Sequence, residues 1–362
     1  MALLRSILLA TDYRQSSQAA AEAVVRLAAA FGSRVTALHV REQFLTWPVS
    51  PFEYQDRLTQ FLTDRKVDLA EFLVHAGAPA ETVVRKAQEL DADLLVIGAG
   101  EKIRDGHLVV GPIGESILER ASSPVLALNP HGPKLRFGSI LCPVDHSRVS
   151  QRALEDAIQF ARSFGGRLVV LSVVPEVSWL AAAAETGHVS GAKLEHEAQW
   201  VKEFDEFLAG VSFDGVEWER ELRRGVPHEQ ITAAAKERGA DLLAIGATGR
   251  SGVVRVLLGS VTRRVLRHLP CSVLLVKDQT VFEEQFLLDL DVIDRLVGEG
   301  QDRLAAGAPA EAAGKFRQAL ALDPYYVAAL DGLAAASEKI GQPDAAGRYR
   351  QRADRLRSRT GG

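Results

Sequence analysis

The sequence predicts an α/β protein with two doubly wound, five-stranded parallel-sheet domains, followed by an all-α segment. Three observations lead to this fold class. Short apolar runs alternate with stretches of helical periodicity, most of the chain consists of two similar copies, and all strand-like runs end near Val281. Strands that alternate with helices form parallel sheets with helices on both faces.

The internal repeat is visible from direct alignment. Residues 5–40 align with residues 138–173 at a constant offset of 133, so that Asp12 falls on Asp145. Later, HAGAPAETVVRKAQELDADLLVIGA aligns with RRGVPHEQITAAAKERGADLLAIGA at an offset of 148. We therefore expect two copies of one domain, over residues 1–131 and 134–279. The connecting NPHGPK carries the Pro and Gly of a linker.

The elements can be placed most clearly in the second copy. The short apolar run Ser139–Val144 predicts a buried strand, and the apolar stripe of Ser150–Phe164 predicts a helix that ends at Gly165-Gly166. The run RLVVLSVV begins the next strand. Further strands are expected near Glu217–Leu222, Asp241–Gly246 and Ser272–Lys277. A further stretch follows the second strand of each copy, Trp47–Tyr54 in the first and Trp179–Gly191 in the second. The sequence does not decide whether these stretches are lids over a ligand.

The last segment, residues 282–362, predicts helices only. Gly307 and Gly341 are 34 positions apart, as are Pro309 and Pro343, and this is the period of tetratricopeptide helix pairs. Small, aromatic and proline positions of such a repeat fall on Gly300, Ala312, Phe316, Ala319 and Pro324. In the second repeat the aromatic position falls on Tyr349 or Arg350. A generic Ala-rich helical bundle is the alternative. Two repeats alone would leave an apolar face exposed, so we expect this segment to dock on the α/β part of the chain or on another subunit.

Composition and charge exclude several classes of protein. The net charge of −4 and the isoelectric point near 6.2 disfavour nucleic-acid binding. Two cysteines, Cys142 and Cys271, fit a reducing compartment. The N-terminus reads as a first strand rather than a signal peptide, and the apolar stretch Leu168–Ala184 is interrupted by Pro175 and Glu176. We expect a cytoplasmic protein without a membrane segment.

A glycine-rich loop in the second copy is the candidate site. It begins at Gly246, directly after the predicted strand ADLLAIG, and ligands of doubly wound sheets bind beyond the carboxyl ends of strands. Its glycines allow backbone N–H groups to approach an anion, and Ser260 opens a helix whose first N–H groups can hold a phosphate. Arg250 adds a positive charge. The loop therefore predicts phosphate binding, although it matches neither a P-loop nor a dinucleotide fingerprint.

The spacing Gly246-x2-Gly249-x9-Gly259-Ser260 resembles the ATP-binding signature of the universal stress protein domain, in the adenine-nucleotide α-hydrolase-like superfamily. PVDHS after the first strand, GVPHEQI before the third helix and LPCSVLLVK at the end are also similar to that family. The resemblance covers both copies. It implies the strand order 3-2-1-4-5 in each domain and an ATP site in the second, with Mg²⁺ and other adenine nucleotides left open.

The resemblance also implies roles for individual residues. Asp145 would contact the ribose or adenine, and Val173 and Ile245 would flank the adenine. The ribose and phosphates would be lined by Gly246, Gly249, Arg250, Gly259, Ser260 and Val261. Two structural readings stay open beside these roles: Asp145 as a cap or turn residue, and Ser260 as a plain helix N-cap, which is compatible with phosphate binding.

The first copy departs from the signature at its centre. It keeps Asp12, Gly98 and Gly111, but Glu101 stands at the place of Gly249 and Pro112 at that of Ser260. A carboxylate repels phosphates, and proline removes a backbone N–H donor. We expect this site to be empty or altered and its domain to be a structural partner. The terminal strands SPVLALN and CSVLLVK should pair, giving an internal pseudo-dimer; a homodimer remains open.

The sequence favours an ATP-binding stress-response regulator or adaptor that contacts a protein partner through its C-terminal helices. No catalytic residue and no metal ligand is assigned, because no nucleophile–base pattern or metal-ligand spacing is found. Two alternatives stay open. One is a slow ATPase or autophosphorylating enzyme, and the other is a structural adaptor with a vestigial loop.

Overall fold

The protein folds into two units, Met1–Gln279 and Thr280–Gly362, in the computed structural model. The structure describes residues 4–12, 14–41, 51–100, 103–104, 107–175, 189–249, 258–277, 279–322 and 326–360. Pro324 and most of the two stretches left open as lids lie outside these ranges. None of the described helices combines the length and the apolarity needed to cross a membrane.

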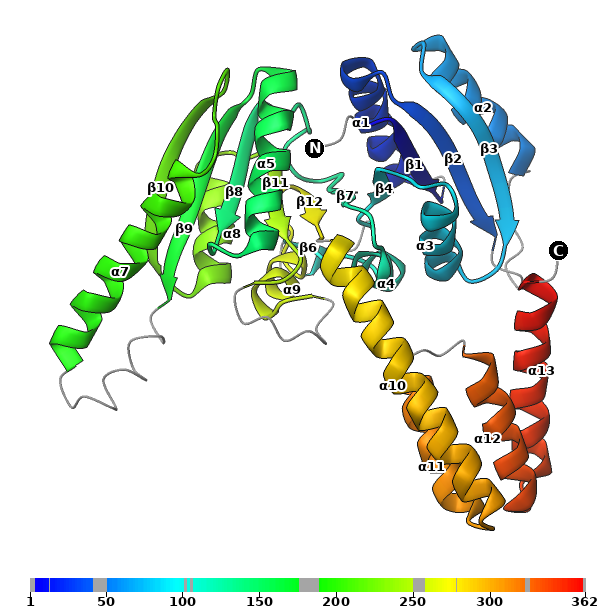
Figure 1. Ribbon diagram of the computed structural model, residues 1–362. Coiled ribbons are helices and arrows are strands. Elements are labelled where there is room, and N and C mark those ends of the chain that lie inside the picture. Colours follow the sequence, from blue (N-terminus) through cyan, green and yellow to red (C-terminus); the bar gives the residue numbers. More distant parts are fainter. Residues whose placement is uncertain are drawn as a thin grey trace. The chain divides into compact units, whose positions relative to one another are not determined.

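The first copy alternates strands and helices, as the sequence predicts (Figure 1). Its elements in chain order are β1 (Ser6–Thr11), α1 (Gln15–Phe31), β2 (Arg34–Arg41), α2 (Pro51–Asp64), β3 (Asp68–Ala76), α3 (Pro79–Glu89), β4 (Leu94–Gly98), β5 (Ile103–Arg104), β6 (His107–Leu108), α4 (Pro112–Arg120) and β7 (Val125–Leu128). The short β5 and β6 form an antiparallel pair of their own.

The second copy repeats this order. Its elements are β8 (Ser139–Val144), α5 (Arg148–Phe164), β9 (Arg167–Pro175), α7 (Val189–Ala209), β10 (Glu217–Gly225), α8 (Pro227–Glu237), β11 (Leu242–Gly246), α9 (Ser260–Leu266) and β12 (Ser272–Val276). The duplication extends to the helix ends. Gly32 after α1 and Gly165 after α5 have φ of 66° and 62°, and each donates its N–H to the carbonyl four residues back.

Both copies contribute to one ten-stranded sheet. Its order is β10-β9-β8-β11-β12-β7-β4-β1-β2-β3, so each half has the expected order 3-2-1-4-5. The halves join where β12 and β7 pair antiparallel, with Val273 opposite Ala127 and Leu275 opposite Val125. The predicted pairing of the two terminal strands is confirmed.

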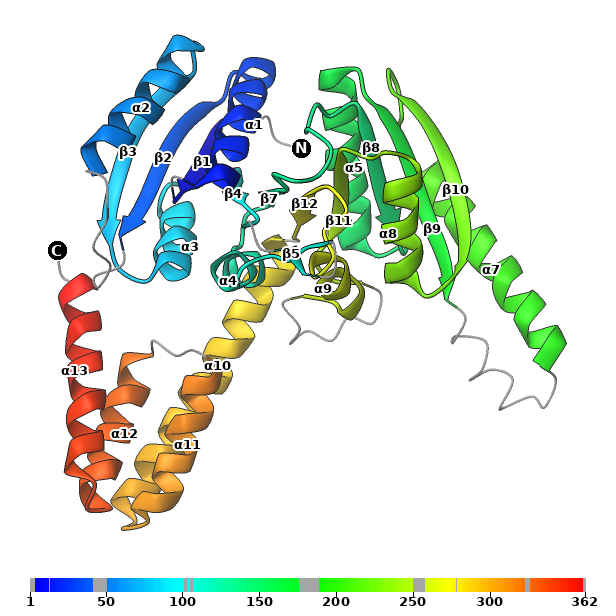
Figure 2. The ribbon, with the colours of Figure 1, turned by 180° about the vertical axis from the view of Figure 1, so that it is seen from behind.

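Alternate residues of the strands enter two separate cores. On β1, Ile7 and Leu9 belong to the core on the face of α1, α2, α5 and α7, whereas Leu8 belongs to the core on the face of α3, α4, α8 and α9 (Figures 1 and 2). This is why the central strands are apolar throughout. Each core contains residues of both copies, so the two copies are packed as one body.

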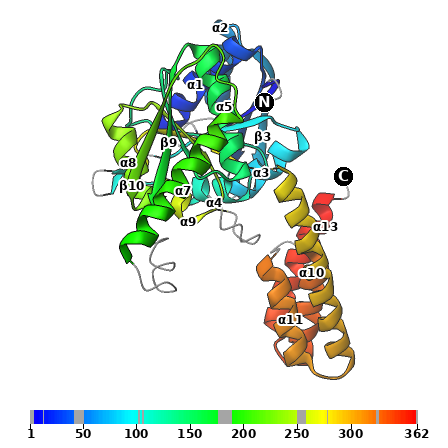
Figure 3. The same cartoon turned by 60° about the vertical axis from the view of Figure 1, so that its left-hand side comes forward.

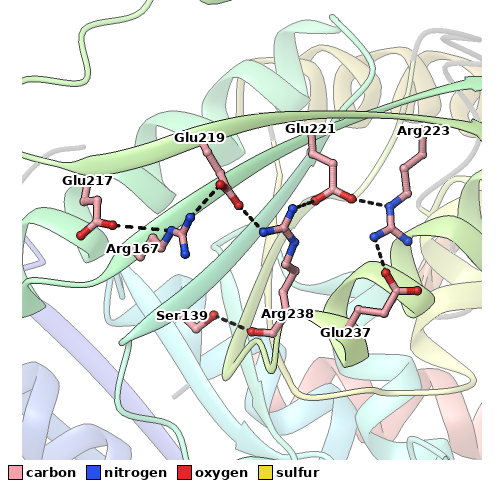
Figure 4. A network of polar contacts seen from close by, with 8 residues as sticks. All are labelled: Ser139, Arg167, Glu217, Glu219, Glu221, Arg223, Glu237 and Arg238. Carbon is pink, nitrogen blue, oxygen red and sulfur yellow. Dashed lines mark hydrogen bonds and ion pairs between the residues drawn. The ribbon is translucent and has the colours of Figure 1, made fainter.

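Charged side chains line the outer strand β10 (Figure 4). Glu219 pairs with Arg167 of β9 at 2.7 Å and with Arg238. Arg238 continues to Glu221 at 2.8 Å, and Arg223 links Glu221 to Glu237 of α8. The outer pairs of this network are exposed, whereas Glu221 and Arg223 are half-buried; charges on an edge strand oppose pairing with another chain.

The C-terminal unit consists of four helices that lie alongside one another (Figure 3). They are α10 (Gln279–Ala305), α11 (Pro309–Leu322), α12 (Val327–Lys339) and α13 (Pro343–Thr360). The turns after α10 and α12 are alike at a distance of 34 residues. Gly307 and Gly341 have φ of 78° and 83°, and the next residues, Ala308 and Gln342, each donate to a carbonyl five positions back.

Phe316 is the centre of this helical core and is fully buried. A Cβ atom on Gly300 of α10 would lie 2.7 Å from its ring, and one on Gly332 of α12 would overlap the ring more closely still. The ring therefore fills a space that exists only because both positions are glycine. In the second repeat Tyr349 packs against the core, whereas Arg350 pairs with Glu338 at 2.5 Å.

Candidate functional site

A cavity of about 510 Å³ lies at the carboxyl ends of β8, β9 and β11. From β8 the chain runs outward to β9 and β10 and then crosses to β11 on the other side of β8, so this is the topological switch point of the second copy's half of the sheet. Eight of the nine predicted site residues line it: Asp145, Val173, Ile245, Gly246, Gly249, Gly259, Ser260 and Val261. The ninth, Arg250, lies outside the described residues.

Gly246 forms the floor of the cavity where β11 meets α5. A Cβ atom there would lie 3.1 Å from Val149 Cγ1 and 3.3 Å from the Ser150 backbone nitrogen, so a larger residue would push the helix away. Thr262 of α9 donates its hydroxyl to the Gly246 carbonyl at 2.8 Å. This bond fixes the start of α9 against the end of the strand.

The two ends of the glycine-rich loop are held together. Gly259 donates its N–H to the Ala247 carbonyl at 2.7 Å, which joins the start of α9 to the end of β11. Ser260 follows as the first residue of α9. Helix α9 has only seven residues, so its dipole is weak. The Ser260 hydroxyl and the first backbone N–H groups of α9 would therefore be the main donors to an anion here.

Asp145 is a turn residue whose carboxylate also lines the cavity. Its Oδ1 accepts from the Ser147 hydroxyl at 2.5 Å and from the Ser147 N–H at 3.2 Å, as a turn residue does. Ser147 in turn caps α5 by accepting from the Ser150 N–H at 3.3 Å. The other oxygen, Oδ2, borders Gly249 so closely that a Cβ atom on Gly249 would overlap it. The carboxylate is therefore fixed by its turn and still lines the cavity.

The cavity has a wall from α7 that was not expected from the sequence. His196, Gln199, Trp200 and Glu203 line it. They stand at positions i, i+3, i+4 and i+7, which is the spacing of residues on one face of a helix. This spacing could have been recognised in the sequence. The wall is anchored to β9, because the Trp200 indole N–H donates to Ser172 Oγ at 2.9 Å.

His146 supports this anchor from behind. It has a φ of 64° and directly follows Asp145. Its Nε2 lies 3.2 Å from Ser172 Oγ, and its ring stacks on Phe204 with centroids 5.7 Å apart. The turn that carries Asp145 is thus packed against the same helix that forms the wall.

The first copy has a smaller cavity, of about 280 Å³, at the equivalent place. Asp12, Gly98, Gly111 and Pro112 line it; Glu101 lies outside the described residues. In the part of the chain that the structure describes, no group of three or more His, Cys, Asp or Glu side chains could hold a metal ion.

Fold and cavity together define a tandem α/β protein with a cavity at the switch point of its second copy. The universal stress protein family matches residues 4–129 and 136–277. The chain therefore belongs to the universal stress protein family and carries two copies of its domain in tandem.

Individual relatives agree with this assignment. Universal stress protein MJ0531 of Methanocaldococcus jannaschii is 34% identical over 146 residues, which cover 39% of this chain and 82% of the relative. A universal stress protein of Mycolicibacterium smegmatis is 26% identical over 297 residues, 75% of this chain and 96% of the relative. The crystal structure of the functionally unknown protein PA1789 of Pseudomonas aeruginosa, 19% identical, covers 79% of this chain and 96% of its own with a TM-score of 0.60. This last similarity concerns the fold alone.

Proposed function

We propose that the second domain binds an adenine nucleotide, ATP in the first place, and that the protein acts as a nucleotide-dependent regulator or adaptor. The observation that carries the proposal is the convergence of eight residues, singled out from the sequence alone, on one cavity at the switch point. They come from separate strands and from both ends of the loop, so chance proximity along the chain does not account for it.

The two ends of the cavity differ in chemistry in the way a nucleotide requires. Leu171, Val173, Ile231 and Ile245 give an apolar surface for a base, with the Asp145 carboxylate beside it as an acceptor for ribose hydroxyls. Gly249, Gly259 and Ser260 give small residues with N–H and hydroxyl donors for phosphates. The first turn of α9 contains no acidic residue and is followed by Arg263 and Arg264.

For the C-terminal unit we propose two tetratricopeptide-like helix pairs that contact a protein partner. The repeated turn geometry at Gly307 and Gly341 supports the repeat, since hydrogen bonds as well as residues recur after 34 positions. The buried, unpaired cysteines Cys142 and Cys271 favour a cytoplasmic location.

The proposal is tested by calorimetric titration of the full chain with ATP, before and after Gly249→Glu. The new side chain starts in overlap with Asp145 Oδ2 and adds a second carboxylate, so steric and electrostatic terms both oppose the nucleotide. We expect one ATP per chain for the unchanged protein and at least a hundred-fold weaker binding for the variant, roughly 3 kcal/mol.

Gly347→Glu is the matched control, because nothing lies within 4 Å of a Cβ atom at this position in α13. It should bind ATP as the unchanged protein does. Normal binding by Gly249→Glu would place the phosphates elsewhere, and absence of binding by the unchanged protein at millimolar ATP would favour the adaptor with a vestigial loop. Following the bound ATP over hours separates a binder from an ATPase, since rapid turnover contradicts the regulator. Cyclic AMP is titrated alongside, because the loop does not fix the number of phosphates.

A further inference from the structure

The cavity of the first copy is not a collapsed remnant of the second. Most of its lining residues have equivalents in the lining of the second cavity at the offsets of 133 and 148, but the described residues give it no counterpart of the α7 wall. Asp12, Val40, Ile97 and Gly98 stand where Asp145, Val173, Ile245 and Gly246 stand in the second copy. All four line the cavity, so the half assigned to base and ribose is retained.

The retained carboxylate lies in a similar turn in both copies. Asp12 Oδ1 accepts from the N–H two residues further on, Arg14, at 3.1 Å, and the same oxygen of Asp145 accepts from Ser147 N–H at 3.2 Å. The Asp12 N–H lies 3.0 Å from Ser17 Oγ, and the Asp145 N–H lies 3.3 Å from Ser150 Oγ. Both carboxylates are therefore fixed by the backbone of their turns, although the hydroxyl that donates to Oδ1 is that of Ser17 in the first copy and that of Ser147 in the second.

The other half of the first cavity has lost its donors. Pro112 replaces Ser260, which removes both a hydroxyl and a backbone N–H, and the partly exposed Ile113 follows it. Glu115 is the acidic residue in the first turn of α4, at the place of Arg263 in α9. A phosphate would meet the apolar Pro112 and Ile113 here, without a hydroxyl donor at the start of the helix.

The cations at this cavity do not offset that loss. Arg14 lines the mouth, and its Nε lies 3.7 Å from Asp12 Oδ2, so its charge faces a carboxylate. His39 is buried with its Nδ1 2.9 Å from the Thr11 carbonyl, which can only accept, so Nδ1 carries a proton. Burial lowers the pKa of His39, which disfavours a positive charge on the ring.

From this combination we propose that the first domain binds a phosphate-free nucleoside, with adenosine as the probe, at the cavity of Asp12, Val40 and Ile97. The base packs on the apolar residues and the ribose hydroxyls donate to Asp12. The volume of about 280 Å³, against about 510 Å³ in the second copy, fits the smaller ligand. This inference rests on the proposed function, because the role of each retained position is taken from the second site.

The test is a titration of the full chain with adenosine in the presence of saturating ATP, which fills the second site. We expect one adenosine per ATP-loaded chain, and Asp12→Ala should lower the affinity for adenosine at least ten-fold. Asp145→Ala is titrated without ATP, and binding at the first site is followed by NMR signals of β1 and β2. In this variant the affinity of the first site for adenosine should be unchanged. Cytidine serves as the control for base size. Circular dichroism confirms that both variants are folded.

The outcomes separate the two proposals. If ATP binds but the ATP-loaded chain takes up no adenosine, the first-domain site is refuted and the proposed function stands. If ATP does not bind, the proposed function fails; adenosine binding that depends on Asp12 then still supports the first site. Adenosine binding that depends on Asp145 and not on Asp12 overturns the inference.

Discussion

Phe316 shows how strongly a single position can determine packing in this protein. Its ring lies between Gly300 and Gly332, where no side chain atom could be added without displacement. The sequence predicts an aromatic position of a helical repeat at Phe316 and a small one at Gly300. It does not reveal Gly332 as the second wall, because that contact joins α11 to α12 and follows from no local pattern.

Gly332→Ala is expected to destabilise the C-terminal unit by up to about 2 kcal/mol, because an overpacking cost of roughly 1–3 kcal/mol is only partly offset by the roughly 1 kcal/mol that alanine gains over glycine in a helix. Gly347→Ala, with nothing within 4 Å of the new atom, should instead be neutral or stabilising by up to about 1 kcal/mol. Urea unfolding followed by circular dichroism measures both. Equal stabilisation by the two substitutions would contradict the close contact with Phe316.

The site residues are predictable to different degrees. Gly246, Gly249 and Gly259 were singled out from their spacing, and all three line the cavity; a Cβ atom on Gly246 would crowd α5, and one on Gly249 would overlap Asp145 Oδ2. The wall of His196, Gln199, Trp200 and Glu203 was not predicted, although its helical spacing is present in the sequence. Which helix face meets a cavity depends on the packing of α7 against β9, and no local feature encodes that contact.

Helix α5 carries a buried acid that makes stability depend on pH. Asp156 is 5% exposed, and burial raises its pKa from 3.8 to about 6. The groups near it are Arg152 and Glu155 on the same helix and Cys142 on β8. At pH values between the two pKa values, Asp156 is protonated in the folded state and ionised in the unfolded state. The free energy of unfolding therefore falls as the pH rises from about 4 to 6.

Asp156→Asn should remove this dependence. At pH 8 we expect the variant to be more stable than the unchanged protein by up to about 3 kcal/mol, the equivalent of a shift of roughly two pKa units, and at pH ~4.5 the difference should shrink toward zero. Glu155→Gln, at an exposed neighbouring position, is the control and should show no such trend. A difference that is the same at both pH values would argue against a buried proton on Asp156.

Element boundaries are predicted best where a local signal marks them. The strand Ser139–Val144 is found as predicted. The helix predicted from Ser150 begins at Arg148, because Ser147 caps it. The strand predicted over Glu217–Leu222 continues to Gly225, since its charged half pairs with β9 and gives no apolar signal.

On the scale of the whole molecule, the two copies share their cores across the β7–β12 junction. Contacts from equivalent positions of the two copies secure it: Asn129 donates its side-chain N–H to the Leu269 carbonyl at 3.1 Å, and Lys277 donates to the Glu119 carbonyl at 2.7 Å. Phe160 of the second copy packs edge-on against Phe31 of the first, with centroids 5.8 Å apart. Only the duplication and the terminal strands make this arrangement predictable.

We therefore expect two thermal transitions, one for both α/β copies together and one for the helical unit. Phe160→Ala, a fully buried aromatic, should destabilise the first transition by about 3–5 kcal/mol and leave the second in place, and Phe316→Ala should do the reverse. Differential scanning calorimetry distinguishes the transitions. Separate melting of the two α/β copies would contradict a shared core.

The central claim, that the second domain is the nucleotide-binding half of a duplicated pair, is tested most directly by a crystal structure of the full chain with ATP. We predict the nucleotide in the second cavity, with the base beside Val173 and Ile245, the ribose at Asp145 and the phosphates along Gly249, Gly259 and Ser260. ATP in the first cavity, or outside both, would contradict the claim.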